Sequence, residues 1–273
     1  MEDAAGAPLV SCLMVTRLAP DRMEGALAAV AAFQAQDHPA RELVVVLDPS
    51  AGESVRRRLD DLIASAGPAP VRGAEATGAT TLGALRNRAL AAAAGDYVCQ
   101  WDDDDIYHPL RLSAQLAALR AGGHEALYLQ EVLQYFPASR SLYWTNWRAT
   151  PAGVHPGTLL MRREAPVRYP ESGPESRLGE DLVLARALGE RGGLGALAGA
   201  PHLFAYVSHG SNSWDDEHHR MLVRELAVSR GVLRRHEQAL RAGVAGLDLG
   251  LQPVQVLGPN GAAFEIAPTP VPA

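Results

Sequence analysis

The 273-residue chain contains no lysine, so its permanently basic side chains are all arginines. A P-loop kinase needs a lysine after the glycines of its phosphate-binding loop, and the sequence therefore excludes that class. Alanine, by contrast, is abundant. We attribute both biases first to the base composition of the genome, so no single arginine is interpreted from its presence alone.

Cysteine occurs only twice, as Cys12 and Cys99. Both positions lie in apolar segments that we expect to be buried strands. Two isolated thiols provide neither a disulfide framework nor the spacing of a zinc site. We therefore expect reduced thiols in the core of a cytoplasmic protein.

Long apolar runs and an excess of positive charge are also missing. No run reaches the length of a membrane-spanning helix, and no charged segment followed by an apolar one opens the chain. The net charge of −6 gives no excess of positive charge for non-specific binding of nucleic acid. We expect a cytoplasmic location and no nucleic-acid partner.

Five arginines fall in the last long helix that the sequence predicts. A solvated helix face is the default interpretation of such a charge pattern. The minority hypothesis is a docking surface for anionic lipid or a lipid-linked acceptor, which would place the protein peripherally at the inner face of the membrane. The five residues are Arg220, Arg224, Arg230, Arg234 and Arg235.

The composition, 47% hydrophobic and 21% charged, is that of an ordinary globular protein. Between residues 10 and 101, apolar strands alternate with amphipathic helices. This alternation is typical of a parallel sheet covered by helices, so we predict the α/β class. The expected strands span 10–15, 42–47, a short segment near 71 and 97–101, and the expected helices span 23–36, 54–66 and 81–94.

Polar residues follow three of these strands, namely Thr16, Asp48 and the run from Asp102 to Asp105. Ligands of parallel α/β sheets bind at the carboxyl ends of the strands, so we expect these residues to converge on one site. Adjacent carboxylates favour a bound cation, and oxygen ligands suit Mg²⁺ or Mn²⁺. A solvated acidic turn is the alternative. An EF-hand is excluded, because its sixth position would be Tyr107 instead of glycine.

The second half is expected to contain more antiparallel structure. Aromatic, β-prone runs predict a hairpin, further short strands and a terminal hairpin. Ser213 to Asp216 resembles a capping box that opens one long helix carrying aligned leucines. The expected elements are strands at 127–136 and 142–148, a short strand within 155–161, a helix from 180, a strand at 203–207, the long helix from 213 to about 240, and a hairpin of 254–257 with 263–266.

Three blocks of sequence resemble glycosyltransferase family 2. They are Leu85-Arg86-Asn87-Arg88-Ala89-Leu90, then Ala94-Gly95-Asp96-Tyr97-Val98, and then Trp101 followed by four aspartates and Ile106-Tyr107-His108-Pro109. They are similar to the family's RN-x-[GA]-L, A-x-G-[DE]-Y-[IV] and D-x-DD blocks. The segments 10–16, 36–39, 42–50, 157–164 and 179–181 fall where the family places its other blocks. The resemblance extends over residues 9–215, and its combination of blocks is specific.

The resemblance implies a GT-A fold, with a Rossmann-like nucleotide-binding half on a mainly parallel sheet and an acceptor-side β/α half. The implied organisation is a flexible N-terminus at 1–8, a GT-A domain at 9–214 with halves at 9–109 and 110–214, and a C-terminal helix, hairpin and proline-rich tail at 215–273.

The activity that the resemblance implies is metal-dependent transfer of a sugar, with inversion, from a nucleotide-diphosphate sugar to an acceptor hydroxyl. The donor would be UDP-linked, the cofactor Mn²⁺ or Mg²⁺, and the acceptor a glycan, a lipid-linked molecule or a small molecule, as in bacterial polysaccharide biosynthesis. The alternative is a catalytically silent homologue that binds nucleotide sugars. Retention of both the aspartate run and Asp181 argues against that alternative.

The resemblance also implies residue roles. Asp181 would be the general base, although an acid in the first turn of a helix also caps the helix dipole. Metal ligands are implied at Asp104 and at His209. For His209 the alternative is an ordinary turn without a metal. Donor contacts are implied at Thr16, Asp48, Arg86, Asp102 and Asp103, and Asp105 has no assigned role. Weak acceptor contacts are expected from Trp144, Trp147 and Glu180, for which core packing or capping is the alternative.

Two departures from the family fall in the expected nucleoside pocket. Val15-Thr16-Arg17-Leu18 stands where the family has Pro-Thr-Tyr-Asn, and Leu47-Asp48-Pro49-Ser50 where it has Asp-Asp-Gly-Ser. The sequence therefore leaves the base of the donor open.

Overall fold

The computed structural model describes residues 6–48, 51–79 and 81–267. They form two compact units that alternate along the chain. Unit 1 comprises the chain up to Asp104, Pro109–Tyr128 and Pro156–Gly195, and unit 2 comprises Asp105–His108, Leu129–His155 and the chain from Ala196. Residues 1–5 of the expected flexible N-terminus and 268–273 of the proline-rich tail lie outside the described residues. The expected domain boundaries stay a prediction.

A seven-stranded sheet in the order β10-β6-β9-β4-β1-β2-β3 organises unit 1. Strands β4, β1, β2 and β3 run parallel, whereas β9 runs antiparallel to both β4 and β6. This mixed, mainly parallel sheet confirms the predicted α/β class. Its strands are β1 (Val10–Thr16), β2 (Arg41–Leu47), β3 (Val71–Ala74), β4 (Tyr97–Gln100), β6 (Ala126–Leu129), β9 (Leu160–Arg162) and β10 (Leu194–Leu197).

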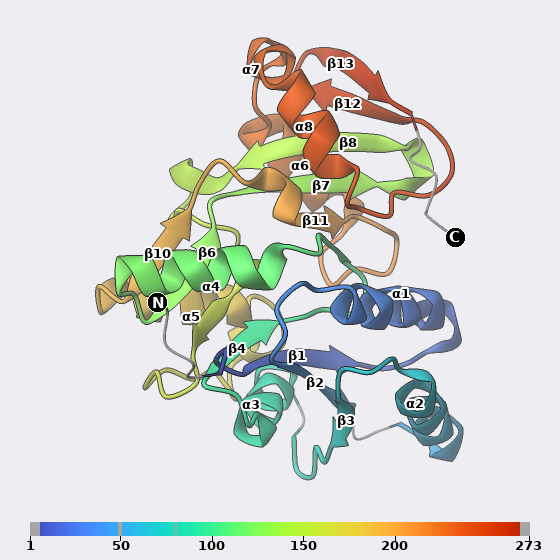
Figure 1. Cartoon of the computed structure of the whole chain (residues 1–273), viewed down its shortest axis with the longest axis vertical. Helices are drawn as coiled ribbons and strands as arrows, with labels where there is room; N and C mark the ends of the chain where they lie inside the picture. Colours follow the sequence, from blue (N-terminus) through green and yellow to red (C-terminus); the bar gives the residue numbers. More distant parts are fainter. Residues whose placement is uncertain (1–5, 49–50, 80, 268–273) are drawn as a thin grey trace. The chain divides into compact units, whose positions relative to one another are not determined.

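Helices cover both faces of the parallel strands. Figure 1 shows α1 on one side of β1 and β2 and α3 on the other. Right-handed crossovers require this, because the chain moves outward from β1 to β3 and then returns to β4 at the centre. The helices are α1 (Met23–Gln34), α2 (Glu53–Ser65), α3 (Leu82–Ala92), α4 (Arg111–Gly122) and α5 (Glu180–Glu190).

The end of β4 is fixed to α1 by Trp101, whose side chain is fully buried. Its indole nitrogen donates a 3.0 Å hydrogen bond to the carbonyl of Ala29, and its ring packs edge-on against Phe33. Both partners lie on the buried face of α1. The residue that precedes the aspartate run is therefore a core anchor, and the run begins at a rigid point.

Unit 2 contains a second, mixed sheet in the order β13-β12-β8-β7-β11-β5. The predicted terminal hairpin is present as β12 and β13, and the strand expected at 203–207 as β11. The strands are β5 (Ile106–Tyr107), β7 (Glu131–Phe136), β8 (Ser141–Asn146), β11 (Phe204–Val207), β12 (Val254–Gly258) and β13 (Gly261–Ile266), and the helices are α6 (Asp216–Leu226), α7 (Arg230–Arg235) and α8 (Glu237–Val244).

The prediction of one long C-terminal helix was wrong, since α6, α7 and α8 take its place. The chain leaves the helical path at Ala227, which bridges to Thr145, and the amide of Val228 donates to the carbonyl of Trp144 at 2.9 Å. Leu233 and Leu240 nevertheless reach the same core, so their spacing did not reveal the breaks. The cap is Asp215, which accepts from the amide of His218, and not Ser213.

The strand expected at 127–136 is also divided. Ala126–Leu129 pairs with β9 in the seven-stranded sheet, whereas Glu131–Phe136 pairs with β8. Apolar content alone gave no signal for this change of sheet.

Candidate active site

The predicted convergence of polar strand ends is confirmed. Strands β1, β2 and β4 are parallel neighbours, with Thr16 opposite Leu47 and Leu13 opposite Gln100 in register. Their carboxyl ends therefore lie at the same edge of the sheet. The amide of Asp48 donates a 3.1 Å hydrogen bond to the carbonyl of Thr16, which ties the ends of β1 and β2 together.

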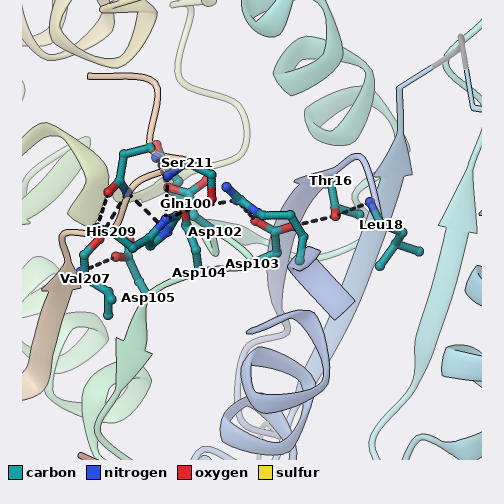
Figure 2. Close-up of polar contacts among 12 residues, drawn as sticks. Thr16, Leu18, Gln100, Asp102, Asp103, Asp104, Asp105, Val207, His209 and Ser211 are labelled. Carbon is teal, nitrogen blue, oxygen red and sulfur yellow. Dashed lines mark hydrogen bonds and ion pairs between the residues drawn. The ribbon is translucent and has the colours of Figure 1, made fainter. Parts of the chain in front are cut away.

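The four aspartates after β4 have different surroundings. Asp103 and Asp105 are buried, with 3% and 6% exposure, whereas Asp102 and Asp104 are half-buried. Asp105 accepts a 2.9 Å hydrogen bond from the amide of Val207 within unit 2 (Figure 2). Asp105 thus has a structural role in holding the end of β11.

Asp102 is held by Arg86 and Gln100. Arg86 Nη1 donates to Asp102 Oδ1 at 2.9 Å, and Gln100 Nε2 donates to Asp102 Oδ2 at 2.8 Å. Gln100 in turn accepts from the hydroxyl of Tyr169 at 3.3 Å. The carboxylate is therefore oriented by donors on both of its oxygens, and Figure 2 shows it beside Gln100.

Arg86 also joins Asp102 to the start of α5. Its Nε donates to Glu180 Oε1 at 2.8 Å, and both Arg86 and Glu180 are buried. Burial alone lowers the pKa of Arg86, but the charges of Asp102 and Glu180 outweigh it and raise the pKa well above its usual value. Arg86 therefore stays charged between its two carboxylates.

Gly83 allows α3 to bring Arg86 to this place. A Cβ atom at Gly83 would lie 1.9 Å from the carbonyl oxygen of Pro170 in the segment that leads to α5. Only a residue without a side chain permits such a close approach.

Asp181, the predicted base, is the second residue of α5 and is half-buried. Its Oδ1 accepts from the amide of Leu182 at 2.7 Å. Burial and the neighbouring charge of Glu180 raise the pKa of Asp181 to about 7, and Arg86 offsets only part of this rise. A carboxylate with a pKa near neutrality is suited to accept a proton in catalysis.

Asp103 and Asp104 share a second arginine, Arg22. Arg22 Nη2 contacts Asp103 Oδ1 and lies 2.9 Å from Asp104 Oδ2. The hydroxyl of Thr16 donates to the other oxygen of Asp103, and Figure 2 shows these two side chains pointing toward each other. The predicted donor contacts of Thr16 and Asp103 stay predictions, and here the two side chains form a hydrogen bond with each other.

His209 lies in unit 2, in the turn after β11, and both of its ring nitrogens have local contacts. Nδ1 accepts from the amide of Ser211 at 3.2 Å, and Nε2 lies 3.4 Å from Asn212 Nδ2. Among the residues that the structure describes, no group of three or more His, Cys, Asp or Glu is arranged to hold a metal ion alone. The metal-ligand role of His209 stays a prediction.

The expected acceptor residues have other contacts. Trp144 is buried in the hydrophobic core of unit 2, with its ring edge-on to His236. Trp147 is half-buried, donates from its indole nitrogen to Thr145 Oγ1 at 3.1 Å, and lies edge-on to His155. Glu180 is paired with Arg86. These contacts support packing and positioning roles for all three.

Sequence reasoning missed three residues of this site. Arg22, Gln100 and Tyr169 all contact the strand-end acids or their partners, yet none belongs to the family blocks that the resemblance identified. A signal did exist for Arg22, because buried carboxylates need a counter-charge and Arg22 closely follows the first strand end.

The structure thus combines an α/β fold, strand-end carboxylates held by arginines, and a nearby carboxyl group, Asp181, of raised pKa. The family model "Glycosyl transferase family 2" matches residues 11–166, more than half of the chain. The chain belongs to glycosyltransferase family 2. It is therefore a glycosyltransferase that uses a nucleotide sugar.

Solved structures share the GT-A-like fold. S. aureus TarS 1-349 has a TM-score of 0.53 and 15% identity, over 86% of this chain and 73% of that chain. The mannosyltransferase PcManGT from Pyrobaculum calidifontis, in complex with GDP-Man and Mn²⁺, has a TM-score of 0.57 and 16% identity, over 88% and 66%. At these identities the likeness shows the fold alone. In a further structure of TarS, this chain covers 43% of that chain.

A comparison with curated proteins gave no significant match. Among the described residues, no helix is both long and apolar enough to cross a membrane.

Proposed function

We propose that this protein is a metal-dependent, inverting glycosyltransferase that moves a sugar from a UDP-linked donor to an acceptor hydroxyl, with Asp181 as the general base. One observation carries the proposal. A single buried arginine, Arg86, joins Asp102 at the end of β4 to Glu180, the neighbour of Asp181. The acid expected to contact the donor and the acid expected to accept the proton are thereby held in one network.

The donor would bind at the carboxyl ends of β1, β2 and β4, with Thr16 and Asp48 near the nucleoside and Arg86 with Asp102 near the ribose and phosphates. UDP, UDP-GlcNAc and GDP-Man occur in the solved structures of similar fold, which supports a nucleotide-diphosphate donor. The altered residues Arg17 and Leu18 lie in this region. The choice of UDP is therefore the part of the proposal that a donor screen must establish.

The carboxylate of Asp104 offers oxygen ligands, which suit Mn²⁺ or Mg²⁺. Such ions are commonly held by one or two carboxylates together with substrate phosphates and water. When bound, the cation would neutralise charge that develops on the diphosphate leaving group.

Asp181 would take the proton of the acceptor hydroxyl as its oxygen attacks the anomeric carbon. The bond from that carbon to the diphosphate oxygen breaks on the opposite side, which inverts the configuration. Glu180 and Arg86 hold the first turn of α5 in place. The raised pKa makes Asp181 a stronger base than an ordinary aspartate while leaving it largely ionised above pH 7.

The acceptor is proposed at the level of a hydroxyl on a glycan, a lipid-linked molecule or a small molecule. The arginines of the C-terminal helices support a solvated face better than a lipid-binding one. Arg220 pairs with Asp216 at 2.6 Å. Glu237 pairs with Arg234 at 3.1 Å and with Arg241 at 2.7 Å, so these arginines have carboxylate partners within the C-terminal helices. We therefore propose no membrane contact through this face.

A thermal-shift screen of nucleotide-diphosphate sugars, with and without Mn²⁺, tests the proposal. A ligand that binds the native state raises the unfolding temperature by mass action. We expect a Mn²⁺-dependent shift in the wild type and none in Asp104→Ala. The catalytically silent alternative predicts the same shift without transfer in a product assay. A protein that responds to no donor would contradict the proposal.

A further inference from the structure

Arg22 contacts two successive members of the aspartate run through one nitrogen. Arg22 Nη2 binds Asp103 Oδ1 and lies 2.9 Å from Asp104 Oδ2. Asp103 is nearly fully buried, whereas the side chains of Arg22 and Asp104 are 23% and 19% exposed. One end of this bridge is thus fixed in the interior and the other is accessible to water and ligands.

The backbone that carries Arg22 is anchored. Leu18 is fully buried in a left-handed conformation with φ 43°, its amide donates to Thr16 Oγ1 at 3.0 Å, and its carbonyl accepts from Arg58 Nη1 at 3.1 Å. After Arg22, a Cβ atom at Gly25 would lie only 2.7 Å from the carbonyl oxygen of Asp103. The start of α1 is therefore packed directly on the aspartate turn, and Arg22 can move by side-chain rotation alone.

The charge of Arg22 allows it to exchange its contact with Asp104 for a contact with another anionic group. The Arg22 guanidinium stays charged, because an arginine side chain does not lose its proton near neutral pH. While Arg22 contacts Oδ2 of Asp104, that oxygen is shared with an existing cation. A guanidinium also binds phosphate oxygens well, which gives Arg22 a second partner when a diphosphate is present.

We propose that Arg22 is a built-in counter-cation of Asp104, which weakens divalent-metal binding to the ligand-free protein and is drawn to the diphosphate when the donor binds. This inference rests on the proposed metal role of Asp104. It predicts that metal and donor bind cooperatively, because each helps to release the contact that opposes the other. Arg22 acts through Asp104 and is therefore a positioning residue.

The test is titration of the full-length protein with Mn²⁺ alone, without nucleotide, followed by the electron-spin resonance signal of free Mn²⁺. We expect Arg22→Gln to bind Mn²⁺ roughly tenfold more tightly than the wild type, because Asp104 loses a competing partner. Arg57→Gln is the matched control. Arg57 is an exposed arginine of α2, so the variant removes the same charge from a different element, and we expect wild-type affinity.

The double variant Arg22→Gln/Asp104→Asn decides whether the effect passes through Asp104. We expect the gain to disappear relative to Asp104→Asn alone. Wild-type affinity in Arg22→Gln, or a gain that persists in the double variant, would overturn the inference. If Arg22→Gln does not fold, Arg22→Lys is used, for which a smaller gain is expected and an unchanged affinity is the contradicting result.

Failure of the proposed function has a different outcome. It would appear as a lack of any Asp104-dependent Mn²⁺ binding even with the donors of the thermal-shift screen. The inference fails separately if such binding exists and Arg22→Gln does not change it in the nucleotide-free protein.

Discussion

Two arginines contact the same aspartate run, and their surroundings differ. The side chain of Arg86 is 10% exposed, lies between Asp102 and the buried Glu180, and uses two different nitrogens. Arg22 uses one nitrogen for both of its carboxylates and is more exposed. The run therefore has a mostly buried ion-pair network that joins Asp102 to the start of α5, and a more exposed contact at Asp104, the expected metal ligand.

Loss of Arg86 is expected to have the largest effect on stability. Arg86→Ala leaves Glu180 buried without its partner, so we expect the free energy of unfolding to fall by about 3–5 kcal/mol. Denaturant unfolding measures this loss. Arg22→Ala is the matched comparison and should cost less than half as much, because Arg22 is more exposed than Arg86 and Asp103 keeps its hydrogen bond from the hydroxyl of Thr16. Equal losses would remove the distinction between the two arginines.

Alanine substitution of the glycines near the two arginines should also destabilise the protein more at Gly83, near Arg86, than at Gly25, near Arg22. Gly83→Ala places a methyl group against the carbonyl of Pro170, and we expect a loss of about 2–3 kcal/mol, since backbone must move. Gly25→Ala meets Asp103 at a longer distance, and part of the strain is offset by the better helix propensity of alanine, so about 1 kcal/mol is expected. Thermal or denaturant unfolding of both variants measures the difference. A larger loss at Gly25 would contradict the account.

The two arginines should differ in their effect on the pH dependence of transfer, because only Arg86 is close to Asp181, the expected base. Asp181 must be ionised to accept a proton, so activity should rise with pH through about 7 and then level off. Arg86→Gln removes a positive charge that lowers the pKa of Asp181, and the rising limb should move about one pH unit higher. The pH profile of kcat measures this. Arg22→Gln should leave the limb in place, and a shift there would break the comparison.

The smallest expected difference is in how salt changes the stability lost in Arg22→Ala and in Arg86→Ala. Contacts near the surface are screened by ions, so the stability lost in Arg22→Ala should shrink by about 0.5 kcal/mol between about 50 mM and 1 M NaCl. The loss in Arg86→Ala should stay nearly constant, because that network is buried. Denaturant unfolding at the two salt concentrations checks both values. Equal salt dependence would place Arg86 and Arg22 in similar surroundings.

Sequence patterns predicted the parallel strands and the convergence of Thr16, Asp48 and Asp102, because buried parallel strands are continuously apolar and end in polar residues. The division of the aspartate run was not predictable. Which oxygen faces Arg22, Arg86 or the amide of Val207 depends on packing between segments that lie far apart in the sequence.

The C-terminal region shows the same limit. The leucines of residues 222–240 have helical spacing, yet the chain breaks at Ala227 because Val228 pairs with the carbonyl of Trp144 on β8. A tertiary hydrogen bond overrides the local preference for helix at this point. The spacing of apolar residues carries no information about such a hydrogen bond. Trp144 is likewise enclosed by this region, which sequence alone did not separate from a surface sugar contact.

Asp181 is proposed to accept the proton in transfer without being needed to hold the donor. With a donor identified in the screen, the most direct measurement compares donor affinity and transfer rate in the wild type, Asp181→Asn and Asp104→Ala. The account predicts that Asp181→Asn keeps donor affinity within about twofold and loses about 10³-fold in transfer, whereas Asp104→Ala loses Mn²⁺-dependent donor binding. Equal loss of donor binding in both variants, or normal transfer by Asp181→Asn, would contradict it.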